Sequence, residues 1–373
     1  MTTQIDETIQ CDWCGYETDL EEWKVQRAGM GASYMFANYD YNGDSRPLCI
    51  DCYSNRTECS DCGYQVYEYD GVYCEVHDES YCEGCYDNSH YSCEHGHESL
   101  HDYGYRPTPL FKRTQAQTEA YTRSGMNEIP LYMGIELETE GSLDIDSLAD
   151  FISADGENHF YLKEDSSVSG PEMVSHPMTL DYWEEWRDSL KALLDSAKQD
   201  QLHTGNNAGF HVHINRDGLG NTRARQAQVE TNILAVLEVH FPKFEQLARR
   251  SETHWARKNT TGTTDLSCGC SNHLCAGTLE TAKMRQGRYS ALNFSNPYTL
   301  EFRLWRSTLN RKNILATLQA IHLMVAVAKH WSLTNILDSK WNDLIALSIG
   351  MPEWWGTTSD MSQFREFFDP DLA

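Results

Sequence analysis

Three short stretches of this 373-residue chain alternate between apolar and polar side chains, and this alternation constrains its fold more than any other feature. They read LYMGIELETE (131–140), GFHVHINR (209–216) and LEFRLWR (300–306). Successive side chains of a β-strand point to opposite faces, so each stretch predicts a strand with one apolar and one polar face. We expect all three in one sheet, with the apolar face packed on helices and the polar face forming a concave site.

The polar face predicted in this way gathers carboxylates, imidazoles and a guanidinium. A further segment, YLKEDSSVSGPEMVSHP (161–177), adds a lysine and more carboxylates. Each pattern alone is usual for a solvated strand edge, but their combination favours a functional site. The members of the predicted face are Glu136, Glu138, Glu140, His211, His213, Asn215, Glu301, Arg303 and Trp305, with Lys163, Asp165 and Glu172 from the added segment.

These residue types suit one kind of chemistry. Carboxylate oxygens are the hard ligands that Mg²⁺ prefers, and phosphate oxygens commonly complete its shell. Arginine meets phosphate charge through its bidentate fork. The glycine-rich loops of dinucleotide-binding and P-loop folds are absent from the sequence.

The remainder of the second half of the sequence predicts interspersed strands and helices, which is typical of an α+β domain. Pro242 lies inside one helical stretch and is expected to break it. Strands are expected at Tyr132–Glu140, Phe160–Lys163, Glu172–Ser175, Gly209–Asn215, Tyr289–Phe294 and Thr299–Trp305. Helices are expected at Leu180–Lys198, Asn221–Arg250, Arg311–Trp331 and Leu333–Ile349.

The composition argues against two classes of protein, those that span a membrane and those that bind nucleic acids generally. The chain has no apolar run of about 18–20 residues, as a membrane span requires, and it begins without a secretory signal, so we expect a cytoplasmic protein without a membrane partner. The formal net charge is −26, and residues 1–105 hold 22 acidic against 4 basic side chains. Such a surface repels phosphate backbones and disfavours general nucleic-acid binding. It could steer a cationic substrate.

Ten of the 13 cysteines lie before residue 94, many of them in pairs separated by two residues. This spacing lets a tight turn point both side chains at one ion, and it favours zinc over disulfides in a chain without a secretion signal. Four pairs are close together, and two further pairs would complete a third, ribbon-like site. The predicted zinc ligands are Cys59, Cys62, Cys74, His77, Cys82, Cys85, His90 and Cys93, together with Cys11, Cys14, Cys49 and Cys52.

Two arrangements of the four close pairs are open. They could fill two sites in sequence, or alternate in a cross-braced pattern like that of RING-like and ZZ-like fingers. Metal binding is expected to supply most of the folding energy of so small a region. The fingers would dock a protein partner or substrate, or serve as a structural cap. We therefore expect a zinc-binding domain at 1–100, a linker at 101–130 and a second domain at 131–373.

Four motifs together, in this order and spacing, resemble the amidoligase family of phages and bacteria. They are GIELETE, KEDSSVSGPEMVSHP, GFHVHIN and RYSALNFSNPYTLEFRLWRSTL, and they span roughly residues 130–335. The resemblance implies a glutamine synthetase-like fold and an ATP- and Mg²⁺-dependent ligase. In such an enzyme ATP phosphorylates a carboxylate, and an amine then displaces phosphate to form an amide. The two substrates could be small molecules, peptides or proteins.

The resemblance also implies roles for individual residues. Glu136, Glu138 and Glu172 would bind metal, and His213 or His211 would face the nucleotide and metal. Asn293 and Glu301 would line the site, and Lys163 would contact phosphate. Arg303 would stabilise the charge on the transferred phosphoryl group.

Two other functions remain open at this point: a non-catalytic zinc-finger adaptor on a degenerate ligase scaffold, and an ATP-dependent phosphotransferase on the same fold. Against the adaptor, every polar position expected from the motifs is filled. An insert with Cys268, Cys270, His273 and Cys275 could hold another zinc ion or be a thiol cluster. Arg249 and Arg250 belong to a basic cluster expected at a solvated helix end.

Overall fold

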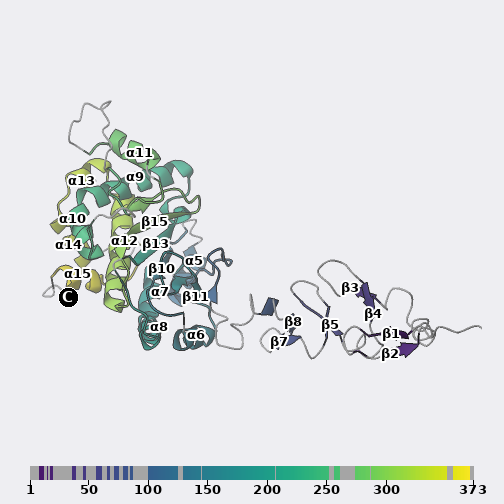
Figure 1. Cartoon of the computed structure of the whole chain (residues 1–373). Coiled ribbons are helices and arrows are strands. Elements are labelled where there is room, and N and C mark those ends of the chain that lie inside the picture. The colour runs from purple at the N-terminus through teal and green to yellow at the C-terminus, as the bar shows by residue number, and fades with distance from the viewer. Residues whose placement is uncertain are drawn as a thin grey trace, which may run out of the picture. The chain divides into compact units, whose positions relative to one another are not determined.

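The computed structural model divides the chain into two compact units, Met1–Glu98 and Ser99–Ala373 (Figure 1). In the second unit the structure describes residues 100–124, 129–143, 145–205, 207–251, 256–260, 274–285, 287–350 and 356–369. In the first unit it describes residues 8–11, 15, 17–19, 36–38, 45–47, 56–60, 65–67, 71–74, 79–82 and 85–86.

The described part of the second unit is built on a seven-stranded sheet with the strand order β14-β15-β13-β10-β12-β11-β9. Neighbouring strands are antiparallel except for β9 and β11, which are parallel. Strand β10 therefore lies in the middle, between β12 and β13. The bounds are β9 Leu100–His101, β10 Met133–Glu138, β11 Phe160–Lys163, β12 Glu172–Ser175, β13 Gly209–Asn215, β14 Leu292–Asn293 and β15 Thr299–Arg306.

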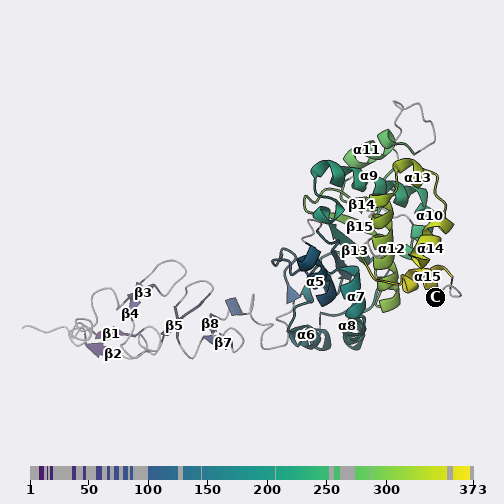
Figure 2. The same ribbon diagram turned by 180° about the vertical axis from the view of Figure 1, so that it is seen from behind.

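Helices are gathered around this sheet (Figures 1 and 2). Their packing confirms the α+β class, with a mainly antiparallel sheet backed by helices. Their bounds are α5 Gln115–Ser124, α6 Asp146–Ser153, α7 Leu180–Glu185, α8 Arg187–Gln199, η2 Arg216–Leu219, α9 Arg223–Val239, α10 Phe241–Ala248, α11 Ala276–Arg285, α12 Arg311–His330, α13 Leu333–Leu337, α14 Trp341–Ile349 and α15 Ser362–Phe368.

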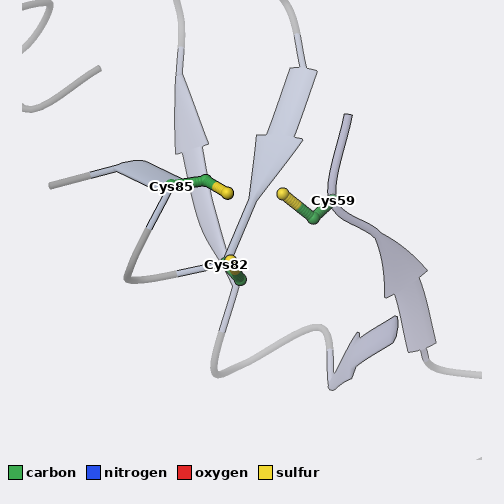
Figure 3. Close-up of side chains that lie close together, drawn as sticks. All are labelled: Cys59, Cys82 and Cys85. Carbon is green, nitrogen blue, oxygen red and sulfur yellow. The ribbon is translucent and has the colours of Figure 1, made fainter. Parts of the chain in front are cut away.

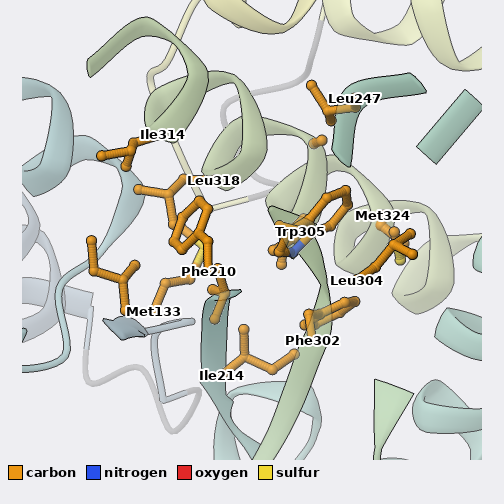
Figure 4. Close-up of a cluster of buried hydrophobic side chains, with 14 of the residues drawn as sticks. Met133, Phe210, Ile214, Leu247, Phe302, Leu304, Trp305, Ile314, Leu318 and Met324 are labelled. Atoms are coloured by element: carbon orange, nitrogen blue, oxygen red, sulfur yellow. The ribbon is translucent and has the colours of Figure 1, made fainter. Parts of the chain in front are cut away.

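Helix α12 forms the centre of the core. Every residue from Ile314 to Ala328 is buried, so other elements surround this helix on all sides. Figure 4 shows Ile314, Leu318 and Met324 of α12 beside apolar side chains of β10, β13 and β15. The apolar residues of the alternating strands thus pack on helices, as the sequence predicts.

Side chains of the sequence explain where the main helices begin. The Asn310 side chain accepts a hydrogen bond from the backbone N–H of Lys312 at 2.9 Å and caps α12. Thr222 caps α9 in the same way. The break expected near Pro242 lies at His240, and the proline occupies the first turn of α10, where its missing N–H costs nothing.

The segment expected to be a linker is part of the second unit wherever it is described. Strand β9 pairs with β11, and Lys112 donates its backbone N–H to the Pro177 carbonyl at 2.9 Å. Gln117 of α5 donates a hydrogen bond to Asp181 at 3.0 Å. These contacts with residues far along the chain tie residues 100–117 to the sheet and its helices.

Trp305 departs from the predicted alternation. It was expected on the polar face, but its side chain is 1% exposed and lies with Leu304, Phe302 and Phe210 in the core (Figure 4). A β-bulge is the reason: Val212 pairs with Phe302 and Phe210 with Trp305, so two residues of β15 stand opposite His211 alone. Beyond the bulge, the faces of β15 are therefore exchanged.

The described parts of the first unit form four two-stranded antiparallel sheets. Cys59, Tyr81 and Tyr86 form a small buried cluster among them. The strands are β1 Thr8–Gln10, β2 Glu17–Asp19, β3 Phe36–Asn38, β4 Ser45–Pro47, β5 Arg56–Glu58, β6 Gln65–Tyr67, β7 Val72–Cys74 and β8 Glu79–Tyr81.

Among the described residues, no helix combines the length and the apolar character needed to cross a membrane.

Candidate functional site

The polar face of the sheet brings together the carboxylates and histidines singled out in the sequence. Glu136 of β10 pairs with His211 of β13, and Glu138 of β10 pairs with Glu172 of β12. His213 pairs in turn with Glu301 of β15. Directly paired residues in an antiparallel sheet share a face with Cβ atoms about 4.5–5.5 Å apart. Four neighbouring strands therefore contribute to one continuous site.

Glu136 lies at the centre of this site between the two histidines. One of its carboxylate oxygens, Oε2, lies 3.3 Å from Nδ1 of His211, and the other, Oε1, lies 3.4 Å from Nε2 of His213. Burial alone would raise the pKa of Glu136, but the adjacent imidazoles hold it well below its usual value. Burial likewise opposes charge on His213, but Glu136 and Glu301 raise its pKa. Glu136 and His213 therefore each favour the charged form of the other, carboxylate and imidazolium.

The carboxylates of this face, Glu136, Glu138, Glu172 and Glu301, form a row across the strands. Glu138 and Glu172 are the part of this row next to Glu136. The backbone N–H of Gly209 donates to Oε2 of Glu138 at 2.5 Å, and Lys163 of β11 lies 3.0 Å from Oε2 of Glu172. Burial and the nearby charge of Glu136 raise the pKa of Glu172 to about 7, although Lys163 acts in the opposite direction. Burial and the charge of Glu136 thus outweigh the effect of the Lys163 ion pair on Glu172.

Glu301 anchors the far side of the row. Asn293 of β14 donates a hydrogen bond to its Oε2 at 2.7 Å, and Arg303 donates to its other oxygen. The same oxygen, Oε1, lies 3.8 Å from Nδ1 of His211. Asn293 and Arg303, both predicted from the sequence, thus fix the carboxylate that faces the histidines.

Three groups on this face place potential metal-ligand atoms within 4.8 Å of one another. Glu136 belongs to two of the groups and Glu172 to two, so the groups are contiguous. They are Glu136, His213 and Glu301; Glu136, Glu172 and His211; and Glu138, Asp165 and Glu172. Oxygen atoms dominate the set, which suits a hard divalent cation such as Mg²⁺.

Asn215 and Glu140 are members of the predicted face that contribute no atom to these groups. The Asn215 side chain accepts a hydrogen bond from the backbone of Tyr132 at 2.8 Å and donates to the Pro130 carbonyl at 3.1 Å, so it orders the chain before β10. Glu140 follows the end of β10 and forms an isolated bridge with His203. The two residues thus order the chain on either side of β10.

A cavity of about 860 Å³ opens beside the row of carboxylates. Glu136 and His213 line one part of it. Aromatic and basic side chains line other parts, among them Tyr161, Tyr298 and Arg113. Sequence patterns gave no sign of this cavity, because residues 107–113, 129–136 and 297–299 are brought together only by the fold.

The β-bulge adds an arginine that the alternation had assigned to the opposite face. Arg306 pairs with Gly209, and a Cβ atom built on Gly209 would lie 2.7 Å from Nε2 of His211 and 3.2 Å from Oε2 of Glu138. Gly209 therefore faces the polar site, and its partner Arg306 shares that face. A strict alternation from Glu301 predicts the reverse.

Arg249 and Arg250 differ from their expected place at a solvated helix end. Both are half-buried, and they donate hydrogen bonds to backbone carbonyls of β15. Arg250 donates to Leu304 and Arg303, each at 2.7 Å, and Arg249 donates to Arg306 at 2.6 Å. The αL conformation of Arg249 ends α10 and turns both side chains toward the strand.

In the first unit, three of the predicted zinc ligands converge. The sulfur atoms of Cys59, Cys82 and Cys85 point toward one another and lie within 4.8 Å (Figure 3). Cys11 is also described and is buried. The predicted ligands Cys14, Cys49, Cys52, Cys62, His77, His90 and Cys93 lie outside the described residues, as does the side chain of Cys74. In the insert, Cys268, Cys270 and His273 lie outside them as well.

The model of the family described as "Putative amidoligase enzyme" matches residues 111–325, more than half of the chain. The chain belongs to the amidoligase family of enzymes. This match confirms the resemblance carried by the four sequence motifs, and it contains every strand of the sheet except β9.

Among solved structures, the amidoligase chain is similar to one chain in the crystal structure of the complex between the prokaryotic ubiquitin-like protein Pup and its ligase PafA. The identity is 13% and the TM-score 0.27, and the similarity covers 64% of this chain and 51% of that chain. The amidoligase chain thus spans about half the length of that relative. No curated protein matches it.

Proposed function

We propose that the second unit is an ATP-dependent carboxylate–amine ligase. A substrate carboxylate would accept the terminal phosphoryl group of ATP, releasing ADP. An amine would then attack the acyl carbon, with loss of phosphate and of one amine proton, to give an amide. The observation that carries this proposal is the row of Glu136, Glu138, Glu172 and Glu301 beside two histidines, in a chain of the amidoligase family.

The donor set fits Mg²⁺, which would offset the negative charge of the phosphates. The raised pKa of Glu172 supports this fit, because burial and the charge of Glu136 both disfavour its ionised form and a divalent cation would favour it. Glu136, Glu138 and Glu172 are the proposed ligands. Gly209 would hold Glu138 in place through its backbone N–H, and Lys163 would orient Glu172.

The remaining members of the face have proposed roles around the phosphates. His213, paired with Glu136, would hold a positive charge beside the metal ligands. Arg303 would stabilise charge on the transferred phosphoryl group, and its Nε is buried without a hydrogen-bond partner among the described residues. Asn293 and Glu301 would keep Arg303 aligned. His211 would bridge the two halves of the row.

The cavity beside Glu136 and His213 is the proposed nucleotide site. Its volume of about 860 Å³ lies in the range of sites for ligands of this size. Phe111 and Tyr298 both line it and are 53% and 80% exposed, so their rings are available for stacking on a base. Arg223, which lines it as well, forms no ion pair with a described residue and could meet phosphate charge.

We further propose that the first unit binds zinc as a structural element and serves to dock a substrate or partner protein. Three converging sulfur atoms suit the tetrahedral thiolate shell of Zn²⁺. Cys59 meets Cys82 and Cys85, which belong to the third of the four close pairs. This geometry supports the cross-braced arrangement, with Cys62 as the proposed fourth ligand.

A trapping experiment tests the ligase chemistry. The full chain would be incubated with Mg-ATP, a panel of carboxylates and hydroxylamine, a small amine that converts an acyl phosphate into a hydroxamate. We expect one carboxylate class to give equal amounts of hydroxamate and ADP. Glu138→Gln should lose both products, whereas Glu164→Gln, a change at an exposed glutamate outside the metal groups, should keep them.

The other two functions give different results in this experiment. A phosphotransferase would release ADP and leave a stable phosphorylated product, with no hydroxamate. A non-catalytic adaptor would release no ADP with any carboxylate in the panel. Either result would contradict the ligase proposal.

A further inference from the structure

The β-bulge in β15 creates a feature that no sequence motif describes. It turns Leu304 and Trp305 together into the core and moves Arg306 to the face that holds Glu138 and His211. The indole N–H of Trp305 is buried without a hydrogen-bond partner among the described residues. A buried donor without a partner has lost its hydrogen bonds to water and is destabilising. The bulge is therefore maintained against a local cost.

Arg250 provides hydrogen-bond donors for backbone carbonyls at the bulge. A bulge interrupts the hydrogen-bond ladder and leaves backbone groups that need other partners. Arg250 donates from Nε to the Leu304 carbonyl and from Nη2 to the Arg303 carbonyl, the two residues opposite His211. Arg249 donates to the carbonyl of Arg306 itself. Two guanidinium groups thus hold the backbone on both sides of Trp305.

The side chain of Arg306 is half-buried. In the part of the chain that the structure describes, its guanidinium donates to no acceptor and forms no ion pair. By contrast, Arg303 is held by Glu301 and Arg250 by backbone carbonyls. A guanidinium with all donors available, on the face of a proposed phosphate site, is suited to an anionic ligand.

The electrostatics of the surrounding arginines agree with this assignment. Burial lowers the pKa of Arg250 to about 10, with Glu138 acting in the opposite direction and Arg303, Arg306 and Arg249 lowering it further. Burial and Arg306 also lower the pKa of Arg249. Four guanidinium groups therefore lie close together near the Glu138 end of the row, a concentration of positive charge that a bound anion would relieve.

We propose that Arg306 binds the terminal phosphoryl group of the nucleotide, and that the bulge held by Arg249 and Arg250 exists to place it there. This inference rests on the proposed ligase function and deepens it. Arg306 would meet the anion opposite Glu138, the proposed metal ligand that Gly209 holds. Arg250 acts on the anion only through β15 and is a positioning residue.

The test compares Mg-ATP and Mg-ADP, which differ in the phosphoryl group concerned. Calorimetry would measure both affinities for the wild-type full chain, Arg306→Gln, Arg306→Lys and Arg311→Gln. Arg311 pairs with Asp188 at the surface and serves as the matched control. We expect Arg306→Gln to weaken Mg-ATP binding about ten-fold, or about 1.4 kcal/mol, with little effect on Mg-ADP. Arg306→Lys should recover part of the loss, and Arg311→Gln should match the wild type.

The outcomes separate this inference from the function on which it rests. If the wild type binds Mg-ATP and Arg306→Gln keeps its preference for ATP over ADP, the assignment of Arg306 is wrong while the nucleotide site stands. If the folded wild type binds neither nucleotide, the proposed function itself fails. Thermal unfolding of each variant checks folding, and an equal loss of both affinities in Arg306→Gln would also contradict the assignment.

Discussion

Nζ of Lys163 lies 3.0 Å from Oε2 of Glu172, and the two side chains are only 3% and 4% exposed. An ion pair so deeply buried is costly to break, because the remaining charge has no solvent around it. The pair also connects β11 to the row of carboxylates on β10 and β12. The Lys163–Glu172 pair therefore contributes both to the stability of the sheet and to the arrangement of the proposed metal site.

Replacing Lys163 by methionine should therefore destabilise the second unit. Lys163→Met leaves Glu172 unpaired, and we expect a loss of about 3 kcal/mol in the free energy of unfolding, measured by urea denaturation. Because an apolar pair of similar volume can replace a buried ion pair, adding Glu172→Leu should recover most of that stability but no Mg-ATP binding. Lys191→Met, at an exposed pair with Asp195, is the control and should unfold like the wild type. Equal stability of Lys163→Met would show that the pair is not essential.

A methyl group at Gly209 should disturb the site without unfolding the sheet. The Cβ of Gly209→Ala would lie 2.7 Å from Nε2 of His211 and 3.2 Å from Oε2 of Glu138, closer than ordinary contacts allow. Both side chains must move, so we expect Mg-ATP affinity in calorimetry to fall about ten-fold, or about 1.4 kcal/mol. Gly156→Ala, where a Cβ meets nothing within 4 Å, should bind like the wild type. Unchanged affinity of Gly209→Ala would place the metal away from Glu138.

The cysteine geometry makes a prediction about zinc stoichiometry. If Cys59 and Cys82 hold the same ion, Cys59→Ser, Cys82→Ser and the double variant should each lose one zinc ion relative to the wild type. Elemental analysis of the purified full chain measures this directly. Ser60→Ala, at an exposed neighbour of Cys59, is the control and should keep the wild-type zinc content. A double variant that loses two ions would instead favour sites filled by consecutive pairs.

The sequence predicted the main strands well, because short-range patterns determine them. The expected bounds of β11, β12 and β13 agree with the structure. The alternation also placed Glu136, Glu138, His211 and His213 on one face, since the side-chain period of a strand is fixed by its backbone. The order of the strands and the pairing of β10 with β12 and β13 lay beyond such patterns.

Three features could not be read from the sequence because long-range contacts decide them. Leu304 and Trp305 are both apolar, so the pattern does not show which of them breaks the alternation. The bulge is held by Arg249 and Arg250, more than fifty residues away along the chain. The parallel pairing of β9 with β11 and the meeting of Cys59 with Cys82 likewise depend on segments distant in sequence.

The most direct test of the central claim is calorimetric binding of Mg-ATP to the wild type and to Glu138→Gln, with zinc kept saturating. Removing one carboxylate charge from the proposed metal shell should weaken binding at least about ten-fold, or about 1.4 kcal/mol. Clear binding by the wild type and a loss of this size in the variant is the predicted result. A well-folded wild type that does not bind Mg-ATP would contradict the account, and the row of glutamates would then be a polar sheet face without a catalytic role.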